Sequence, residues 1–235
     1  MTLSINTIQA SVRGNKPNQI PNQDHIAIFE NDIHLIVSVA DGLGSSLHSL
    51  EGARIACECV INAAQNWKID QQLSELDLMI RKNWDNIIAQ KDEGFKNYRT
   101  TSSFITVFKK DKKILIGQLG DIWVSIQTDG LFQQLCSSDK DFLNETECLG
   151  SGRDQKFKIC MLEFLQSFNF LLATDGIGDE LNIVTIEALH NFFINKFEDI
   201  ESLNRNNILE KDIVQFINEK NNDDKSLVFT WANKN

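Results

Sequence analysis

The chain has 235 residues, of which 42% are hydrophobic, and its 23 basic and 33 acidic residues give a net charge of −10. This length suffices for one globular domain with a substantial core, and the acidic balance disfavours nucleic-acid binding, which needs a basic surface. No apolar run reaches the ~20 residues of a membrane span, and the N-terminus has no signal-peptide pattern. Five cysteines without CxxC spacing fit a reducing compartment, so we expect a cytoplasmic protein.

The first part of the chain is predicted to contain a strand, a loop, a hairpin and two helices. Leu3–Arg13 alternates loosely and predicts a strand, whereas Gly14–Asn22 contains both prolines and predicts a loop. Ile26–Phe29 and Ile33–Val39 are apolar, β-branched and separated by three polar residues, which predicts a hairpin. Apolar residues then recur at three- and four-residue spacing, which predicts amphipathic helices over Leu47–Ala64 and Leu73–Ile88.

Strand patterns dominate the middle of the chain. Asp129-Gly130 is a hairpin turn signal between two of the predicted strands. Ser137–Lys156 is polar and poorly periodic, and we interpret it as a loop or flap. The predicted strands of this part are Ser102–Phe108, Lys113–Leu119, Ile122–Gln127, Leu131–Leu135, Phe157–Phe164 and Phe168–Thr174.

The last part of the chain is predicted to contain two helices and a closing strand. Val184–Phe197 and Ile208–Ile217 have helical periodicity, with a break expected at Asn204–Asn207, and Ser226–Trp231 has strand character. No repeat or linker divides the sequence. The pattern therefore predicts a single α+β domain over residues 1–235, with antiparallel sheets covered by helix pairs.

Aspartates recur at the ends of the predicted strands. Asp41-Gly42 and Asp175-Gly176 each follow an apolar strand, while the others begin or precede one: Asp24, Asp121, Asp223 and Asp224. Converging carboxylate oxygens on rigid strand ends suit a hard cation such as Mg²⁺ or Mn²⁺. Any single Asp-Gly pair is also an ordinary turn signal, so the hypothesis depends on their number and order.

That order resembles the motif set of the metal-dependent type-2C Ser/Thr protein phosphatases (the PPM family), bacterial branch. The resemblance extends over nearly the whole chain. The motifs that carry it are Asn22-Gln23-Asp24, Val39-Ala40-Asp41-Gly42-Leu43-Gly44, Thr100-Thr101, Leu119-Gly120-Asp121, Ala173-Thr174-Asp175-Gly176 and Asp223-Asp224-Lys225-Ser226. The resemblance implies a four-layer α/β/β/α sandwich, in which two antiparallel sheets are flanked by helix pairs.

The resemblance also implies a metal site that contains two Mn²⁺ or Mg²⁺ ions and accommodates a third, weaker one. Asp41 would bridge the two ions, and the carbonyl of Gly42 would join one of them. Asp175 and Asp223 would hold the other ion, and Asp24 would act through metal-bound water. Asp121 matches the position that helps to bind the third ion. In this scheme Asp41, Asp175 and Asp223 are the catalytic residues.

The activity implied is hydrolysis of phosphoserine and phosphothreonine in proteins. A hydroxide that bridges two cations is available near pH 7 and attacks phosphorus, while the cations offset the phosphate charge. The expected partners are a phosphorylated protein substrate and a bacterial Ser/Thr kinase that the phosphatase opposes in signalling, with no nucleic acid and no membrane.

Several residues depart from the family pattern. Gln19 stands near the position of the usual phosphate-binding arginine, and Arg13, the nearest arginine, is our candidate for this role; a solvated surface charge is the alternative. Gln23 stands where many family members have glutamate, so we expect one of the metals to be bound more weakly. None of the predicted metal carboxylates is missing.

Two rival functions stay open at this level. One is a catalytically weak or inactive pseudophosphatase that binds phosphoproteins or acts as a scaffold, which missing metal carboxylates would favour. The other is an N-terminal nucleophile hydrolase in which Thr2 becomes the nucleophile after removal of Met1. This second rival leaves the aspartates at the strand ends unexplained.

Overall fold

The computed structural model describes residues 3–16, 20–134, 146–152, 155–216 and 220–234. The chain divides into two compact units, and each combines segments that are distant in sequence. We call them the terminal unit and the central unit. The terminal unit comprises Met1–Asn22, Trp123–Cys136 and Phe164–Asn235, and the central unit comprises Gln23–Ile122 and Ser137–Glu163. The predicted single domain over residues 1–235 remains a prediction.

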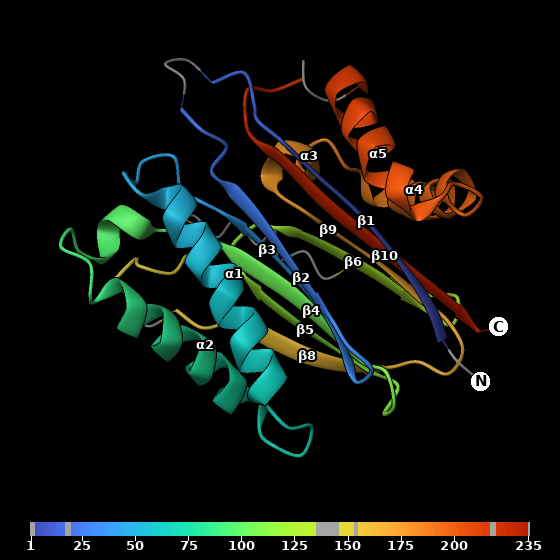
Figure 1. The fold of residues 1–235 in the computed structure, drawn as a ribbon, viewed down its shortest axis with the longest axis horizontal. Helices are drawn as coiled ribbons and strands as arrows, with labels where there is room; N and C mark the ends of the chain where they lie inside the picture. The colour runs from blue at the N-terminus through green and yellow to red at the C-terminus, as the bar shows by residue number, and fades with distance from the viewer. Residues whose placement is uncertain (1–2, 17–19, 135–145, 153–154, 217–219, 235) are drawn as a thin grey trace. The chain divides into compact units, whose positions relative to one another are not determined.

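The central unit is an antiparallel sheet with two helices on one face (Figure 1). Its strands, in spatial order, are β2 (Asp24–Glu30), β3 (His34–Asp41), β4 (Ser102–Phe108), β5 (Lys113–Leu119) and β8 (Lys158–Glu163). Its helices are α1 (Ser49–Asn66), α2 (Leu73–Ile88) and the short 3-10 helix η1 (Phe95–Tyr98). Helix α1 packs on β2 and β3, and α2 packs on α1 and reaches β8.

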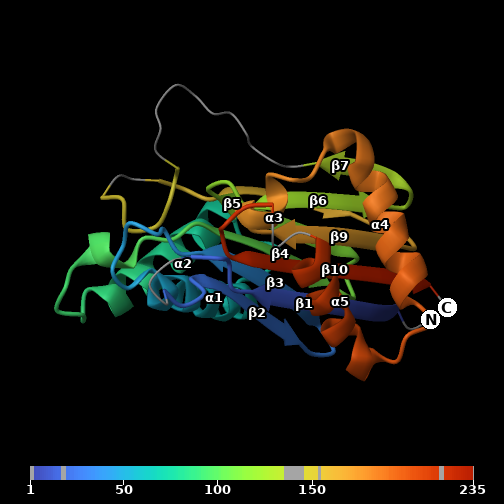
Figure 2. The same cartoon turned by 90° about the horizontal axis from the view of Figure 1, so that it is seen from above.

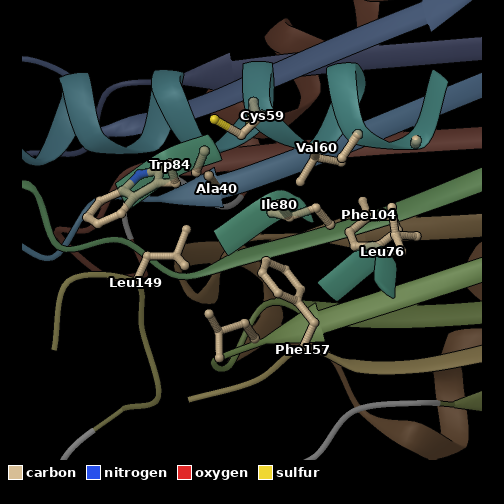
Figure 3. Close-up of a cluster of buried hydrophobic side chains, with 14 of the residues drawn as sticks. Ala40, Cys59, Val60, Leu76, Ile80, Trp84, Phe104, Leu149 and Phe157 are labelled. Carbon is tan, nitrogen blue, oxygen red and sulfur yellow. The ribbon is translucent and has the colours of Figure 1, made fainter. Parts of the chain in front are cut away.

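The apolar stripes of the two helices form the core of this unit together with the covered face of the sheet (Figure 3). Trp84 of α2 is fully buried, and its indole N–H donates to the carbonyl of Gly52 in α1 at 3.3 Å. A Cβ at Gly52 would lie 2.0 Å from the carbonyl oxygen of Tyr98, so the absence of a side chain allows η1 to approach α1. This packing anchors the segment that leads into β4.

The terminal unit is a second antiparallel sheet with its own helices (Figure 2). Its strands, in spatial order, are β1 (Leu3–Val12), β10 (Lys225–Lys234), β9 (Phe168–Ala173), β6 (Trp123–Thr128) and β7 (Leu131–Gln134). Its helices are α3 (Asp175–Gly178), α4 (Ile183–Phe197) and α5 (Ser202–Phe216). Helix α5 packs on β1, and α4 on β9. No helix in the described part of the chain has the length and apolar character needed to cross a bilayer.

These elements confirm the predicted α+β class and the two antiparallel sheets with accompanying helices. The Asp129-Gly130 turn is confirmed as well: both residues have positive φ, and Thr128 pairs with Leu131 across the hairpin. The sequence patterns missed η1 and α3, which are each four residues long. Most of the predicted flap, from residue 137 to residue 145, lies outside the described residues.

The predicted helix break at Asn204–Asn207 is wrong, because α5 is continuous from Ser202. Asparagine is a weak helix former, but tertiary contacts override local propensity here. Arg205 donates to the side-chain oxygen of Asn6 in β1 at 2.7 Å, and Asn206 accepts the backbone N–H of Gln9 at 3.0 Å. The asparagine-rich turn of α5 is therefore held by the edge strand of the sheet.

A buried polar chain crosses the core of the terminal unit. His190 of α4 is fully buried; its Nε2 lies 2.8 Å from the hydroxyl of Ser125, and its Nδ1–H donates to Asn169 at 2.6 Å. Asn169 in turn donates to the side-chain oxygen of Gln127 at 2.8 Å. Burial lowers the pKa of His190 from 6.5 to about 4. The imidazole is therefore neutral near pH 7 and fits this chain of donors and acceptors.

Neutral burial of His190 should make this protein sensitive to acid. The unfolded chain takes up the histidine proton near pH 6.5 and the folded chain only near pH 4, so stability is complete above pH 6.5 and falls as the pH drops toward 4. Glutamine is polar but does not titrate in this range. Between pH 6.5 and pH 4, we therefore expect the unfolding free energy of His190→Gln to fall by about 3 kcal/mol less than that of the unsubstituted protein. Urea denaturation between pH 7 and pH 4 measures the difference. Parallel pH profiles of the two proteins would contradict the assignment.

Candidate metal centre

Two of the predicted ligands, Asp175 and Asp223, line one cavity of about 310 Å³ within the terminal unit. Asp175 follows β9 and begins α3, and Asp223 lies two residues before β10, the neighbour of β9 in the sheet. The other lining residues are Lys16, Gly176, Asp179, Asn221 and Asn222. Adjacent antiparallel strands therefore bring together two carboxylates that are 48 positions apart in sequence.

A close backbone approach holds the two sides of this cavity together. A Cβ at Gly176 would lie 2.0 Å from the carbonyl oxygen of Asp224, so no larger residue fits at this point of α3. The side chain of Asn221 donates to the carbonyl of Gly176 at 3.0 Å. Across the start of the strands, the N–H of Thr174 donates to the carbonyl of Ser226 at 3.0 Å.

A fully buried lysine organises the loop that carries Asp223. The ammonium of Lys225 donates to the backbone and side-chain oxygens of Asn221, at 3.0 and 2.8 Å, and to the carbonyl of Asp223 at 2.6 Å. Buried ammonium groups need such acceptors, because an unpaired buried charge is strongly destabilising. Lys225 thus stabilises the loop conformation through backbone oxygens.

The loop after β1 is bonded to Asp224 and to Asp223, the two residues that come before β10. Asp224 has a side chain that is 1% exposed, and it accepts the N–H of Gly14 at 2.9 Å and the ammonium of Lys16 at 2.9 Å. Lys16 also lies 2.8 Å from Asp223, whose side chain is 47% exposed. Burial lowers the pKa of Lys16, but the hydrogen bonds and charges of both aspartates outweigh it and raise that pKa above the ordinary lysine value.

In the central unit, the strand register brings Asp24 and Asp41 directly opposite each other in β2 and β3. Directly opposite residues project from the same face of an antiparallel pair, with Cβ atoms ~5 Å apart, and like charges in such a pair are destabilising. Asp24 is 5% exposed, so water screens this repulsion poorly. A divalent cation beside these two carboxylates would offset it.

The backbone around Asp41 is fixed by the threonine pair that the sequence motif contains. The carbonyl of Asp41 accepts the N–H of Thr101 at 2.9 Å and the hydroxyl of Thr100 at 2.8 Å. Arg99 adds side-chain bonds to the hydroxyls of Ser45 and Ser46, at 2.9 and 3.1 Å, in the loop that follows. This neighbouring segment therefore holds the whole loop from residue 41 to residue 46.

Asp121 lies in the exposed turn after β5, and the hydroxyl of Thr146 donates to it at 3.3 Å. Gly120 before it has φ 98°, a conformation that glycine adopts without strain, and a Cβ there would lie 2.5 Å from Thr101. This close approach fixes the turn against the segment that supports Asp41. Leu149, in the described end of the predicted flap, pairs with Thr100 through two backbone hydrogen bonds.

Arg13, the candidate phosphate contact, has an exposed side chain at the end of β1. Its guanidinium donates to the carbonyls of Ile20 and Lys16, and Arg13 thereby links these two residues of the segment after β1. In this arrangement Arg13 has a structural role, and a phosphate contact would require these bonds to exchange.

The donor set of both units fits a hard divalent cation, because it consists of carboxylate, amide and carbonyl oxygens. Within the residues that the structure describes, no group of three or more His, Cys, Asp or Glu side chains is arranged to hold a metal ion. The predicted ligands instead form one pair of carboxylates in each unit: Asp175 with Asp223, and Asp24 with Asp41.

Sequence patterns missed several residues of the cavity. Asp179 follows Asp175 by four positions, one helical turn, and this spacing was an available signal. Lys16 and Asn221 carry no such signal, because only the folded loops bring them to the cavity.

The sequence profile described as Protein phosphatase 2C matches residues 13–218. The chain belongs to the protein phosphatase 2C family. The predicted family resemblance is therefore confirmed over most of the chain. No curated protein sequence matches this phosphatase 2C chain significantly.

Solved structures share the fold of this phosphatase 2C chain at low sequence identity. The catalytic domain of the Ser/Thr phosphatase PstP in complex with two manganese ions has a TM-score of 0.64 at 15% identity, over 99% of this chain and 100% of that one. RsbX in complex with magnesium has a TM-score of 0.64 at 18% identity, over 97% and 95% of the two chains. The Ser/Thr phosphatase of S. agalactiae has a TM-score of 0.62 at 17% identity, over 97% and 98%. These likenesses establish the fold.

Gly42 and Gly44 form a matched pair for testing the loop after Asp41. A Cβ at Gly42 would lie 2.6 Å from the backbone of Ser49, whereas at Gly44 the nearest atom is a side-chain oxygen at 3.8 Å. We expect Gly42→Ala to lower the unfolding free energy by about 2 kcal/mol, because helix α1 or the loop must shift. Gly44→Ala should change it by less than about 0.5 kcal/mol. Urea denaturation measures both, and equal effects would contradict this account of the loop.

Proposed function

We propose that this phosphatase 2C chain is a metal-dependent Ser/Thr protein phosphatase that uses two Mn²⁺ or Mg²⁺ ions. The observation that supports the proposal most strongly is the pairing of carboxylates in each unit: Asp24 opposite Asp41, and Asp175 with Asp223 on one cavity. Structural roles alone would not require acidic pairs at strand ends, where like charges are unfavourable.

The residues proposed to hold the ions are those of the family motifs: Asp41 would contact both ions, the Gly42 carbonyl one of them, and Asp175 and Asp223 the other. Asp24 would act through water, and Asp121 would help to bind a third, weaker ion. When bound, such ions lower the pKa of water enough to supply hydroxide near pH 7, and they offset the charge of the phosphoryl group.

The protein's own contribution is to fix these oxygens before substrate arrives. Thr100 and Thr101 hold the backbone of Asp41, and Lys225 holds the backbone of Asp223. Pre-organised ligands need little rearrangement during the reaction, which is the main way that such a site lowers a barrier. Arg13 is the proposed contact for the substrate phosphate.

The substrate class is phosphoserine or phosphothreonine in a protein, and a Ser/Thr kinase of the same bacterial signalling pathway is the proposed opposing partner. The cytoplasm is the proposed location. The pseudophosphatase alternative is not favoured, because every predicted metal carboxylate is present and family membership extends over residues 13–218.

Loss of one ligand should abolish metal-dependent turnover. We expect hydrolysis of p-nitrophenyl phosphate and of a phosphothreonine peptide with Mn²⁺, none with EDTA, and a kcat lower by roughly 100-fold or more in Asp41→Asn and Asp175→Asn. Matched controls are Asp111→Asn and Asp199→Asn, which neutralise exposed aspartates in the central and terminal units. Their kcat should stay within about twofold of the unsubstituted protein.

The decisive negative outcome is a folded protein that binds Mn²⁺ and yet shows no turnover above background. It would contradict the proposal that this protein is an enzyme and make phosphoprotein binding the better hypothesis.

A further inference from the structure

Lys16 is held between two adjacent aspartates of different accessibility. Its ammonium lies 2.8 Å from Asp223, which is 47% exposed, and 2.9 Å from Asp224, which is 1% exposed. The Lys16 side chain itself is only 17% exposed and lines the cavity that Asp175 and Asp223 share. A cation from solvent can therefore reach Asp223 but has little access to Asp224.

The segment that carries Lys16 is fixed in position. The N–H of Gly14 donates to Asp224 at 2.9 Å, and a Cβ at Gly14 would lie 2.2 Å from the carbonyl oxygen of Asp223. Exposed lysine pairs contribute little because their flexible side chains lose entropy on pairing. Here the backbone contact of Gly14 and the burial of Asp224 already restrict the Lys16 side chain, so pairing costs it less entropy. The ion pair of Lys16 with the two aspartates is therefore stronger than an exposed one.

We infer that Lys16 is a built-in counter-ion of Asp223 that a divalent cation must displace, so that Lys16 sets the metal affinity of the site. The inference rests on the proposed function, because only that proposal makes Asp223 a metal ligand. A carboxylate oxygen that accepts a hydrogen bond from an ammonium is a weaker metal ligand, and an ammonium and a divalent cation beside the same carboxylate repel each other.

Asp224 gives the displaced ammonium a remaining partner. Because Lys16 bonds to both aspartates, it can give up Asp223 and keep Asp224, one residue further along the chain. The buried carboxylate of Asp224 then stays paired, which avoids the high free-energy cost of an unpaired buried charge. Exchange at Asp223 therefore does not require the loop to open.

The test is the dissociation constant of Mn²⁺, measured by calorimetry and by the electron paramagnetic resonance signal of free Mn²⁺. We expect Lys16→Gln and Lys16→Met to bind Mn²⁺ on the order of tenfold more tightly than the unsubstituted protein, which corresponds to about 1.4 kcal/mol. Lys16→Arg, which keeps the charge, should bind like the unsubstituted protein. Lys220→Gln is the matched control, since Lys220 is 54% exposed and pairs with Glu180 outside the cavity lining.

Each outcome decides the inference. Unchanged or weaker Mn²⁺ binding in both folded uncharged variants, verified by circular dichroism, would overturn it, because Lys16 would then have only a structural role. If Lys16→Gln fails to fold, Lys16→Met retains the alkyl stem and supplies the measurement. If the unsubstituted protein binds Mn²⁺ and the Lys16 substitutions leave its dissociation constant unchanged, this inference alone is contradicted. If no variant binds Mn²⁺, the proposed function is contradicted as well.

Discussion

The carboxylate pair of each unit depends on an interior strand of that unit's sheet, whose backbone is hydrogen-bonded on both sides. Strand β3 lies between β2 and β4, and β9 lies between β10 and β6. All six residues of β9 are buried, as are the six residues of β3 that precede Asp41. A strand held by hydrogen bonds on both edges and by packing on both faces cannot shift along its axis. Asp41 at the end of β3, and Asp175 just after β9, therefore start from fixed backbone positions.

Each unit then uses a different device to hold the loop beyond its central strand. The central unit supports the Asp41 loop with the threonine pair and Arg99, all from the segment that enters β4. The terminal unit supports the Asp223 loop from within, through the buried ammonium of Lys225. In both units the loop is held largely through backbone oxygens.

Much of this architecture could be predicted from sequence, because the buried strands are largely apolar and Asp41 and Asp175 come at the ends of two of them. The position of Asp24 opposite Asp41 could not, since it depends on the register of β2 against β3. The continuity of α5 through its asparagines depends on contacts with β1, which local propensity does not contain. Lys16 and Lys225 look like ordinary surface lysines in the sequence, and only the folded loops give them aspartate and carbonyl partners.

The buried ammonium of Lys225 has a consequence for the chemistry of the chain. Amine-reactive reagents modify lysines that reach solvent in a neutral form, and Lys225 is fully buried with its ammonium bonded to oxygens of residues 221 and 223. Its modification in the native protein requires a local opening of the loop before β10. The labelling rate of this one amine would therefore report how often that loop opens, and the measurement requires neither substrate nor metal.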